Sequence, residues 1–203
     1  MSKGSPRSTL HMQMGQETIY LLLAVTMFTT IILGGYLLAI ARAKPREDPP
    51  IIVLPEAQGF SFAAGSAALT PGFEDRLRRS VIPRIRQIGQ QYQASVIEVI
   101  GHTDAVQRKS GSGRSNLDAV LVPLLLGKET VAPEAVDNAG LGMARAVSVA
   151  RFMRGAGLRD FILVPLSAGP FLKPDDSVIT ADDVAADESR RRIEVRLRRR
   201  EAR

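Results

Sequence analysis

Residues 96–104 read Val-Ile-Glu-Val-Ile-Gly-His-Thr-Asp, and this stretch decides the fold. The apolar run at 96–100 is typical of a buried strand, which Gly101 then ends. Polar side chains that directly follow a strand lie at the edge of a sheet, where loops carry most binding sites. We therefore expect Thr103 and Asp104 to face a site whose other side is built by a later part of the chain.

The clearest helix pattern after this strand covers 138–153. Its core face is apolar, and glycines stop it shortly afterwards; the core positions are Ala146, Val149, Ala150 and Met153. Asn138 and Arg145 are seven positions apart, which is two helical turns, so they lie on one side of the helix with Leu141 between them. This side is the natural partner for Asp104.

The rest of this region alternates between strands and helices. Thr70 followed by Pro71 predicts a helix start, and Pro83 should kink or split that helix. The predicted strands are 51–54, 60–62, 95–100, 161–166 and 193–197, the last with Glu194, Arg196 and Arg198 on a solvated face. Residues 105–137 have no simple period, so we interpret them as an inserted lobe or flap. The order predicts an α+β or α/β sandwich with helices on one side of a mixed sheet.

The composition of the chain limits the kinds of site and partner that it can have. At 203 residues and 45% hydrophobic content, the chain can form one ordinary domain with segments to spare. It has no cysteine, which excludes disulfides, thiolate metal sites and a cysteine nucleophile. The formal net charge of +6 favours an anionic partner. Nucleic acid is not predicted, because tryptophan is absent and the basic run near the C-terminus is explained by a strand and a basic tail.

One segment is long and apolar enough to cross a membrane. Residues 18–41 carry no charge, and about 24 residues of helix span about 36 Å. A cleaved signal peptide is the alternative, although its apolar region would be unusually long. The predicted organisation is an N-terminal tail at 1–17, a membrane helix at 18–41, a linker at 42–50, a domain at 51–198 with an insert at 105–137, and a basic tail at 199–203.

Charges around the span give a weak orientation signal. Lys3 and Arg7 precede it, whereas Arg42, Lys44 and Arg46 follow it. By the positive-inside rule this count leans, by one charge, towards a cytoplasmic C-terminal domain.

Several of these residues together resemble a known family. Gly101-His102-Thr103-Asp104, followed by Asn138, Leu141 and Arg145-Ala146 with Val149, is similar to the peptidoglycan-binding domain of the OmpA/MotB/Pal group. Residues 60–71 and the terminal 191–195 stretch agree with it as well. The chain departs from the pattern at Gly142, where serine is usual, at Arg190, where asparagine is usual, and in its long insert.

The resemblance implies an OmpA-C-like βαβαββ sandwich preceded by one transmembrane helix. It implies that Asp104 binds the ammonium and Arg145 the carboxylate of diaminopimelate in peptidoglycan, with Thr103, Asn138 and Leu141 lining the same pocket. It also implies a single-pass inner-membrane protein with a periplasmic domain, against the charge count. Alternatively, Asp104 and Arg145 form a structural ion pair with each other.

A second interpretation is a MotB-like stator subunit, a homodimer inside a multi-pass MotA/TolQ-like partner. Stator subunits of that class carry an aspartate in the membrane helix, whereas here only Glu17, at its edge, could carry a proton. We predict no enzymatic activity and no cofactor, because no catalytic or metal-binding motif is visible. The expected partners are peptidoglycan and membrane lipid.

Overall fold

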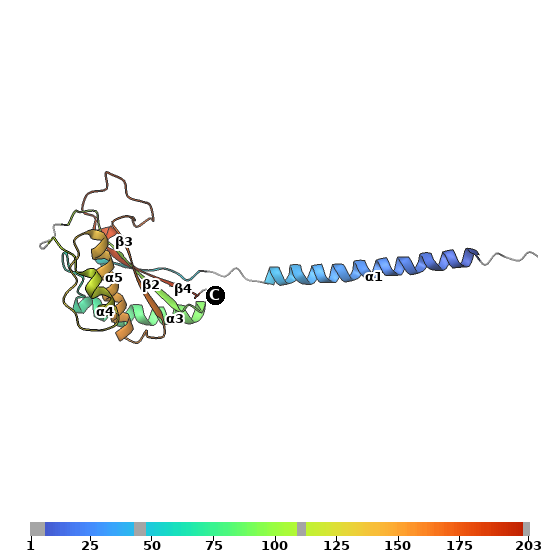
Figure 1. Cartoon of the computed structure of the whole chain (residues 1–203), viewed down its shortest axis with the longest axis horizontal. Helices are drawn as coiled ribbons and strands as arrows, with labels where there is room; N and C mark the ends of the chain where they lie inside the picture. The colour runs from blue at the N-terminus through green and yellow to red at the C-terminus, as the bar shows by residue number, and fades with distance from the viewer. Residues whose placement is uncertain (1–6, 43–47, 109–112, 201–203) are drawn as a thin grey trace, which may run out of the picture. The chain divides into compact units, whose positions relative to one another are not determined.

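The computed structural model of the chain describes residues 7–42, 48–108 and 113–200 (Figure 1). The chain divides into two units, residues 1–46 and 47–203, which are described separately. The first six residues, most of the predicted linker, residues 109–112 near the start of the predicted insert and the end of the predicted basic tail lie outside the described residues.

The first unit contains a single helix, α1, Arg7–Arg42. Within it, Glu17–Ala41 is long and apolar enough to cross a membrane, and it is the one such segment among the described residues. Its threonines satisfy their own hydroxyls, because Thr26 and Thr30 donate to the carbonyls of Leu22 and Thr26 at 2.9 and 2.7 Å. These two hydroxyls therefore need no water as a hydrogen-bonding partner.

The second unit is built on a four-stranded mixed sheet. Its strands are β1, Ile52–Pro55, β2, Val96–His102, β3, Ile162–Gly169, and β4, Arg192–Arg198, in the spatial order β1-β4-β2-β3. β2 and β3 are parallel, whereas β4 is antiparallel to both β1 and β2. The predicted α+β class, with a βαβαββ order of its main elements, is confirmed.

Helices pack on one side of this sheet, and the core lies between them (Figure 1). They are α2, Pro71–Arg76, α3, Ile82–Tyr92, α4, Leu117–Leu125, and α5, Asn138–Gly155. Fully buried core residues come from α2 and the following turn, α3, β2, α5 and β4, and they include Phe73, Leu77, Ile85, Ile97, Val99, Val149, Met153 and Val195.

The predicted helix start at Thr70 is confirmed, since its hydroxyl accepts a hydrogen bond from Phe73 N at 3.2 Å. The helix that begins at Thr70 was predicted to be kinked or split at Pro83, and it is interrupted just before this proline. A π-helical turn, Leu77–Val81, joins α2 to α3, and Pro83 lies in the first turn of α3. Because proline has no N–H to donate four residues back, the widened turn accommodates it without breaking the helical path.

One sequence prediction is corrected here, because the predicted strand at 60–62 is only an isolated bridge between Phe62 and Leu69. Residues 105–137, interpreted as an inserted lobe or flap, contain α4, whose Val120 and Leu124 are buried and which packs on α5. Asn116, directly before α4, is joined to the later part of the same segment. Its side chain accepts a hydrogen bond from Glu134 N at 2.7 Å and donates one to Ala132 O at 3.0 Å.

The predicted solvated face of β4 is also partly wrong. Arg198 is exposed, but Glu194 and Arg192 are buried. The carboxylate of Glu194 lies 2.8 Å from Arg192, 2.7 Å from Arg196 and 3.2 Å from His102 Nε2. Burial acts to raise the pKa of Glu194, but the close approach of His102 and the hydrogen bonds from Arg196 outweigh it and bring the pKa to about 2.

Candidate functional site

All five residues predicted to bind the ligand line one cavity of about 510 Å³ at the C-terminal end of β2. They are Thr103, Asp104, Asn138, Leu141 and Arg145. A slightly larger hollow, of about 560 Å³, lies over the second half of α5 and contains none of them. The predicted residues are therefore brought together in space, although the first two are 34 or more positions from the others in the chain.

Asp104 is held by an arginine that the sequence analysis did not assign to the site. Its Oδ2 accepts from Arg191 Nη1 at 2.8 Å, and Arg191 Nε in turn donates to Glu56 Oε2 at 2.5 Å. Burial lowers the pKa of Arg191, but the hydrogen bonds to Glu56 and Asp104 outweigh it and raise the pKa. The other oxygen, Oδ1, has no donor among the described residues, which leaves it available to a ligand cation.

Arg145 is fixed from α5 without using its terminal nitrogens. Its Nε donates to Ser66 O at 3.0 Å, and its guanidinium lies 4.7 Å from the centre of the Phe62 ring. Neither Nη atom has a recorded acceptor among the described residues. Burial lowers the pKa of Arg145 to about 10, partly offset by the nearby charge of Glu56, so the group stays charged at neutral pH.

Among the described residues, no ion pair within 4.0 Å joins Arg145 to Asp104. Asp104 instead pairs with Arg191. The alternative of a direct structural pair between the two predicted residues is therefore not what the structure contains. Instead, one carboxylate oxygen and one guanidinium fork remain available in the same cavity.

Asn138 connects the two sides of the site. Its side-chain amide donates to Asp104 O at 3.2 Å and to Val106 O at 2.8 Å, which holds the chain after β2 against the start of α5. Asp137 caps that helix, because its Oδ1 accepts from Gly140 N at 2.7 Å. Thr103 is buried and its hydroxyl has no recorded partner, while Leu141 forms part of the apolar wall.

At Gly142, α5 approaches β2 too closely for a side chain. A Cβ at Gly142 would lie 2.5 Å from Ser167 Oγ and 2.8 Å from Gly101 O. A Cβ at Gly101 would lie 2.0 Å from Gly142 O. The two glycines thus set the separation of the elements that carry Asp104 and Arg145, each three positions further along.

Three further charged residues line the cavity beyond those predicted, and they are Glu56, Arg108 and Arg191. Arg108 belongs to the predicted insert and donates to Gly65 O at 3.3 Å, so the start of the insert forms one wall of the cavity. With Asp104 and Arg145, these residues give three cations and two anions. The only sequence signal for Arg191 was its place in the terminal stretch that resembles the family.

The remaining predictions lie outside this cavity. Glu17 is the first residue of the candidate membrane span and is exposed. His102 is buried beside Glu194. No group of three or more potential metal ligands occurs in the part of the chain that the structure describes.

No protein-family model matches the sequence, and no curated protein is significantly similar to it. Solved structures similar to the chain include a MotB-like protein from Desulfovibrio vulgaris, with 22% identity, a TM-score of 0.42, and coverage of 75% of this chain and 74% of that one. The periplasmic domain of Helicobacter pylori MotB has 19% identity and a TM-score of 0.43, with 71% and 79% covered. The cell wall anchor of the T6SS from Pseudomonas aeruginosa has 17% identity and a TM-score of 0.40, with 72% and 79% covered.

Proposed function

We propose that the chain is a membrane-anchored, non-catalytic protein whose domain grips the diaminopimelate stem peptide of peptidoglycan. The observation that supports this most is the cavity itself, which presents Asp104 Oδ1 and the Nη atoms of Arg145 without competing protein partners among the described residues. A free amino-acid end carries one ammonium and one carboxylate. One fixed carboxylate and one planar guanidinium fork match it through charge-assisted hydrogen bonds.

The positions of the two groups are fixed by neighbouring residues, which favours tight binding. Arg191 and Glu56 hold Asp104 from one side, and Ser66 and Phe62 hold Arg145 from the other. Preorganised groups lose little freedom on binding, so more of the interaction energy is available for affinity.

A sedimentation experiment with purified sacculi tests the pocket. The full chain in detergent is expected to sediment with sacculi, and Asp104→Asn or Arg145→Gln is expected to weaken retention at least tenfold, since each removes a charge-assisted hydrogen bond worth about 1.5–3 kcal/mol. The matched control is Asp118→Asn, because Asp118 is exposed on α4 and does not line the cavity. Free diaminopimelate should release the protein, whereas Nα-acetyl-lysine, whose free ammonium has no carboxylate on the same carbon, should release much less.

Retention that is unchanged in the Asp104→Asn, Arg145→Gln double variant would contradict the pocket. If a single variant unfolds, release by free diaminopimelate from the unaltered chain still decides whether the ligand is correct.

We further propose that the anchor is in the inner membrane and that the domain faces the periplasm, because peptidoglycan lies there. The chain contains no cysteine, so Ala185→Cys in an exposed loop creates a unique reactive thiol. Labelling of this thiol by an impermeant maleimide in cells with a permeabilised outer membrane is expected. Labelling only after the inner membrane is opened would instead place the domain in the cytoplasm.

A second candidate function is favoured by Glu17, an exposed carboxylate at the first residue of the span. In a MotB-like stator, two copies of the chain would pair with a multi-pass MotA/TolQ-like subunit, and Glu17 would carry the proton. Purification from native membranes should then recover such a subunit. A Glu17→Gln chain that restores full function to a deletion strain would exclude proton transfer through Glu17.

A further inference from the structure

Three neighbouring hollows form a continuous basic trough along the second half of α5. Their volumes are about 560, 490 and 430 Å³; the first shares Arg78 and Ala156 with the second, and Arg151 and Gly155 with the third. We define the basic trough by its five exposed arginines, which come from four separate segments of the chain: Arg78, Arg86, Arg151, Arg154 and Arg159.

These arginines are not paired with acidic side chains. Among the described residues, none of the five takes part in an ion pair within 4.0 Å, and Glu74 is the single carboxylate that lines the trough. Two of them are nevertheless held in place, because Arg86 donates to Gly157 O at 3.0 Å and Arg78 lies 5.3 Å from the centre of the Phe152 ring. Several fixed cations that are not neutralised attract an anionic surface.

The trough is also partly apolar. Phe152 and Leu69 line the first hollow, and Leu126, at the end of α4, lines the third with 53% of its surface exposed. Arginines above apolar side chains suit the headgroup region of a bilayer, where charged ends meet phosphates and apolar groups reach the acyl boundary.

The position of the trough in the domain points to the same partner. Because β1 pairs Ile52 with Val195 and β2 pairs Val96 with Arg198, the chain enters the domain at the end of the sheet where Val96 lies. α5 ends on that side, since it leads to β3, which begins beside Val96. The ligand cavity lies at the opposite end, where Asn138 begins α5 and contacts Asp104 O.

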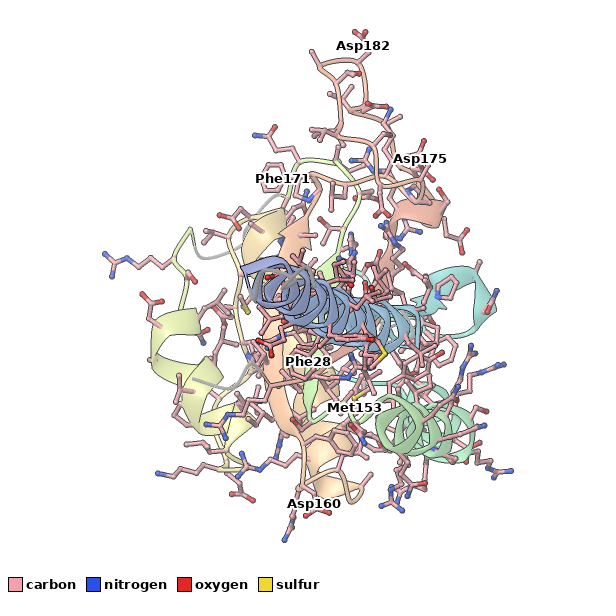
Figure 2. The ribbon with its side chains drawn as sticks, turned by 90° about the vertical axis from the view of Figure 1, so that its right-hand side faces the viewer. Phe28, Met153, Asp160, Phe171, Asp175 and Asp182 are labelled. Atoms are coloured by element: carbon pink, nitrogen blue, oxygen red, sulfur yellow. The ribbon has the colours of Figure 1, made fainter. Side chains whose placement is uncertain are left out.

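An acidic loop of the domain lies away from the basic trough. Figure 2 shows Asp175 and Asp182 on this loop at one extreme of the domain, whereas Asp160, which follows Arg159 in the chain, lies at the other. The domain therefore has an acidic loop well separated from the basic trough, and a uniform attraction to anions is not expected.

We propose that the basic trough docks on the anionic phospholipid headgroups of the membrane that anchors α1, so that the ligand cavity points away from that membrane. Roughly ten residues separate the span from β1, and even fully extended they reach at most about 35 Å. A domain of about 150 residues has a radius of gyration near 15 Å, so it stays within about one diameter of the bilayer. This tether gives the headgroups a high effective concentration at the trough.

Energy transfer in nanodiscs tests the docking. The full chain with Asp160→Cys as a unique labelling site is incorporated into nanodiscs of phosphatidylcholine, with or without phosphatidylglycerol, and transfer to a headgroup acceptor is measured. Higher transfer is expected with phosphatidylglycerol at low salt, decreasing at high salt. Each arginine near an anionic surface strengthens binding about fivefold, so Arg151→Gln with Arg154→Gln should weaken docking roughly 25-fold.

The matched control is Ala181→Glu with Ala185→Glu, which makes the same change in net charge on the exposed acidic loop. Its transfer should stay close to that of the unaltered chain. Equal transfer in the two lipids, or equal losses in the two double variants, would overturn the proposal. Binding to heparin with no response to phosphatidylglycerol would assign the trough to a soluble anionic polymer and overturn it as well.

The inference rests on the membrane anchor of the proposed function, but not on its ligand. A chain that fails to enter nanodiscs would contradict the anchor itself. A chain that enters them and binds sacculi without responding to anionic lipid would contradict only the docking.

Discussion

At the scale of single residues, the site depends on two positions that can hold nothing larger than glycine. Gly101 and Gly142 bring the backbones of β2 and α5 into contact, and this contact sets the spacing of the two charged ligand groups. Larger side chains at these positions would push β2 and α5 apart and would affect ligand binding through that displacement.

Gly101→Ala should destabilise the domain by at least roughly 2 kcal/mol, because its Cβ would lie 2.0 Å from Gly142 O, a backbone atom that cannot rotate away. Chemical denaturation of the full chain followed by circular dichroism measures this. Gly72→Ala is the control, since it meets nothing within 4 Å and lies in a helix, where alanine is favoured. Equal stability of the two variants would show that β2 and α5 are not in contact.

Glu194 makes the stability of the domain dependent on pH. Its pKa lies at about 2 in the folded chain against 4.5 for the ordinary group, so its contribution is complete above about pH 4.5 and is lost as the pH falls through 2. The shift corresponds to roughly 3 kcal/mol. Denaturation curves measured between about pH 6 and about pH 2, which bracket the titration, should show this loss of stability. The Glu194→Gln variant should lose less stability over the same interval.

At the scale of elements, the helix cap at Asp137 matters because α5 carries three of the five predicted ligand residues. Asp137→Ala removes the acceptor for Gly140 N and should cost about 1 kcal/mol. Thermal denaturation of the full chain measures this, with Asp160→Ala, an exposed aspartate outside the helices, as the control. Because Asn138 directly follows the cap, retention on sacculi should also decrease, and unchanged retention would show that the cap acts on stability alone.

Elements with a strong local signal could be predicted from the sequence. The period of the helix after 138, the Thr70-Pro71 start and the strand before Gly101 all depend on neighbouring residues, and the structure contains each of them. α4 was missed because Pro123 interrupts its pattern, while the burial of Val120 and Leu124 against α5 offsets that interruption. The sequence has no local feature that reports this tertiary packing.

The ligand site could be predicted in part for the same reason. Asp104, Asn138 and Arg145 occur in short motifs, whereas the pair that holds Asp104 in place joins Glu56 and Arg191, which are 135 positions apart. The burial of Glu194 likewise depends on Arg192, Arg196 and His102 surrounding it. Contacts of this range follow from sheet topology, which no spacing along the chain reveals.

At the scale of the whole molecule, the domain has its own core, which is formed by residues between Ile52 and Leu197. We therefore expect residues 48–203 to fold without the span, with the same protection of β2 and β4 amides against hydrogen exchange as in the full chain. Loss of that protection on truncation would show that the anchor supports the fold. Sacculus binding should survive truncation, whereas docking to anionic lipid should weaken, because the tether no longer concentrates the domain at the surface.

The direction of β1 determines how the domain would bear a mechanical load. If the domain binds the cell wall as proposed, a pull between membrane and cell wall would act along the strands, because the linker leads into β1 and the ligand cavity lies at the far end of the sheet. The hydrogen bonds between β1 and β4 would then be loaded together in shear and not opened one after another. This ladder has four paired positions, against seven between β2 and β4, so it is expected to yield before the rest of the sheet.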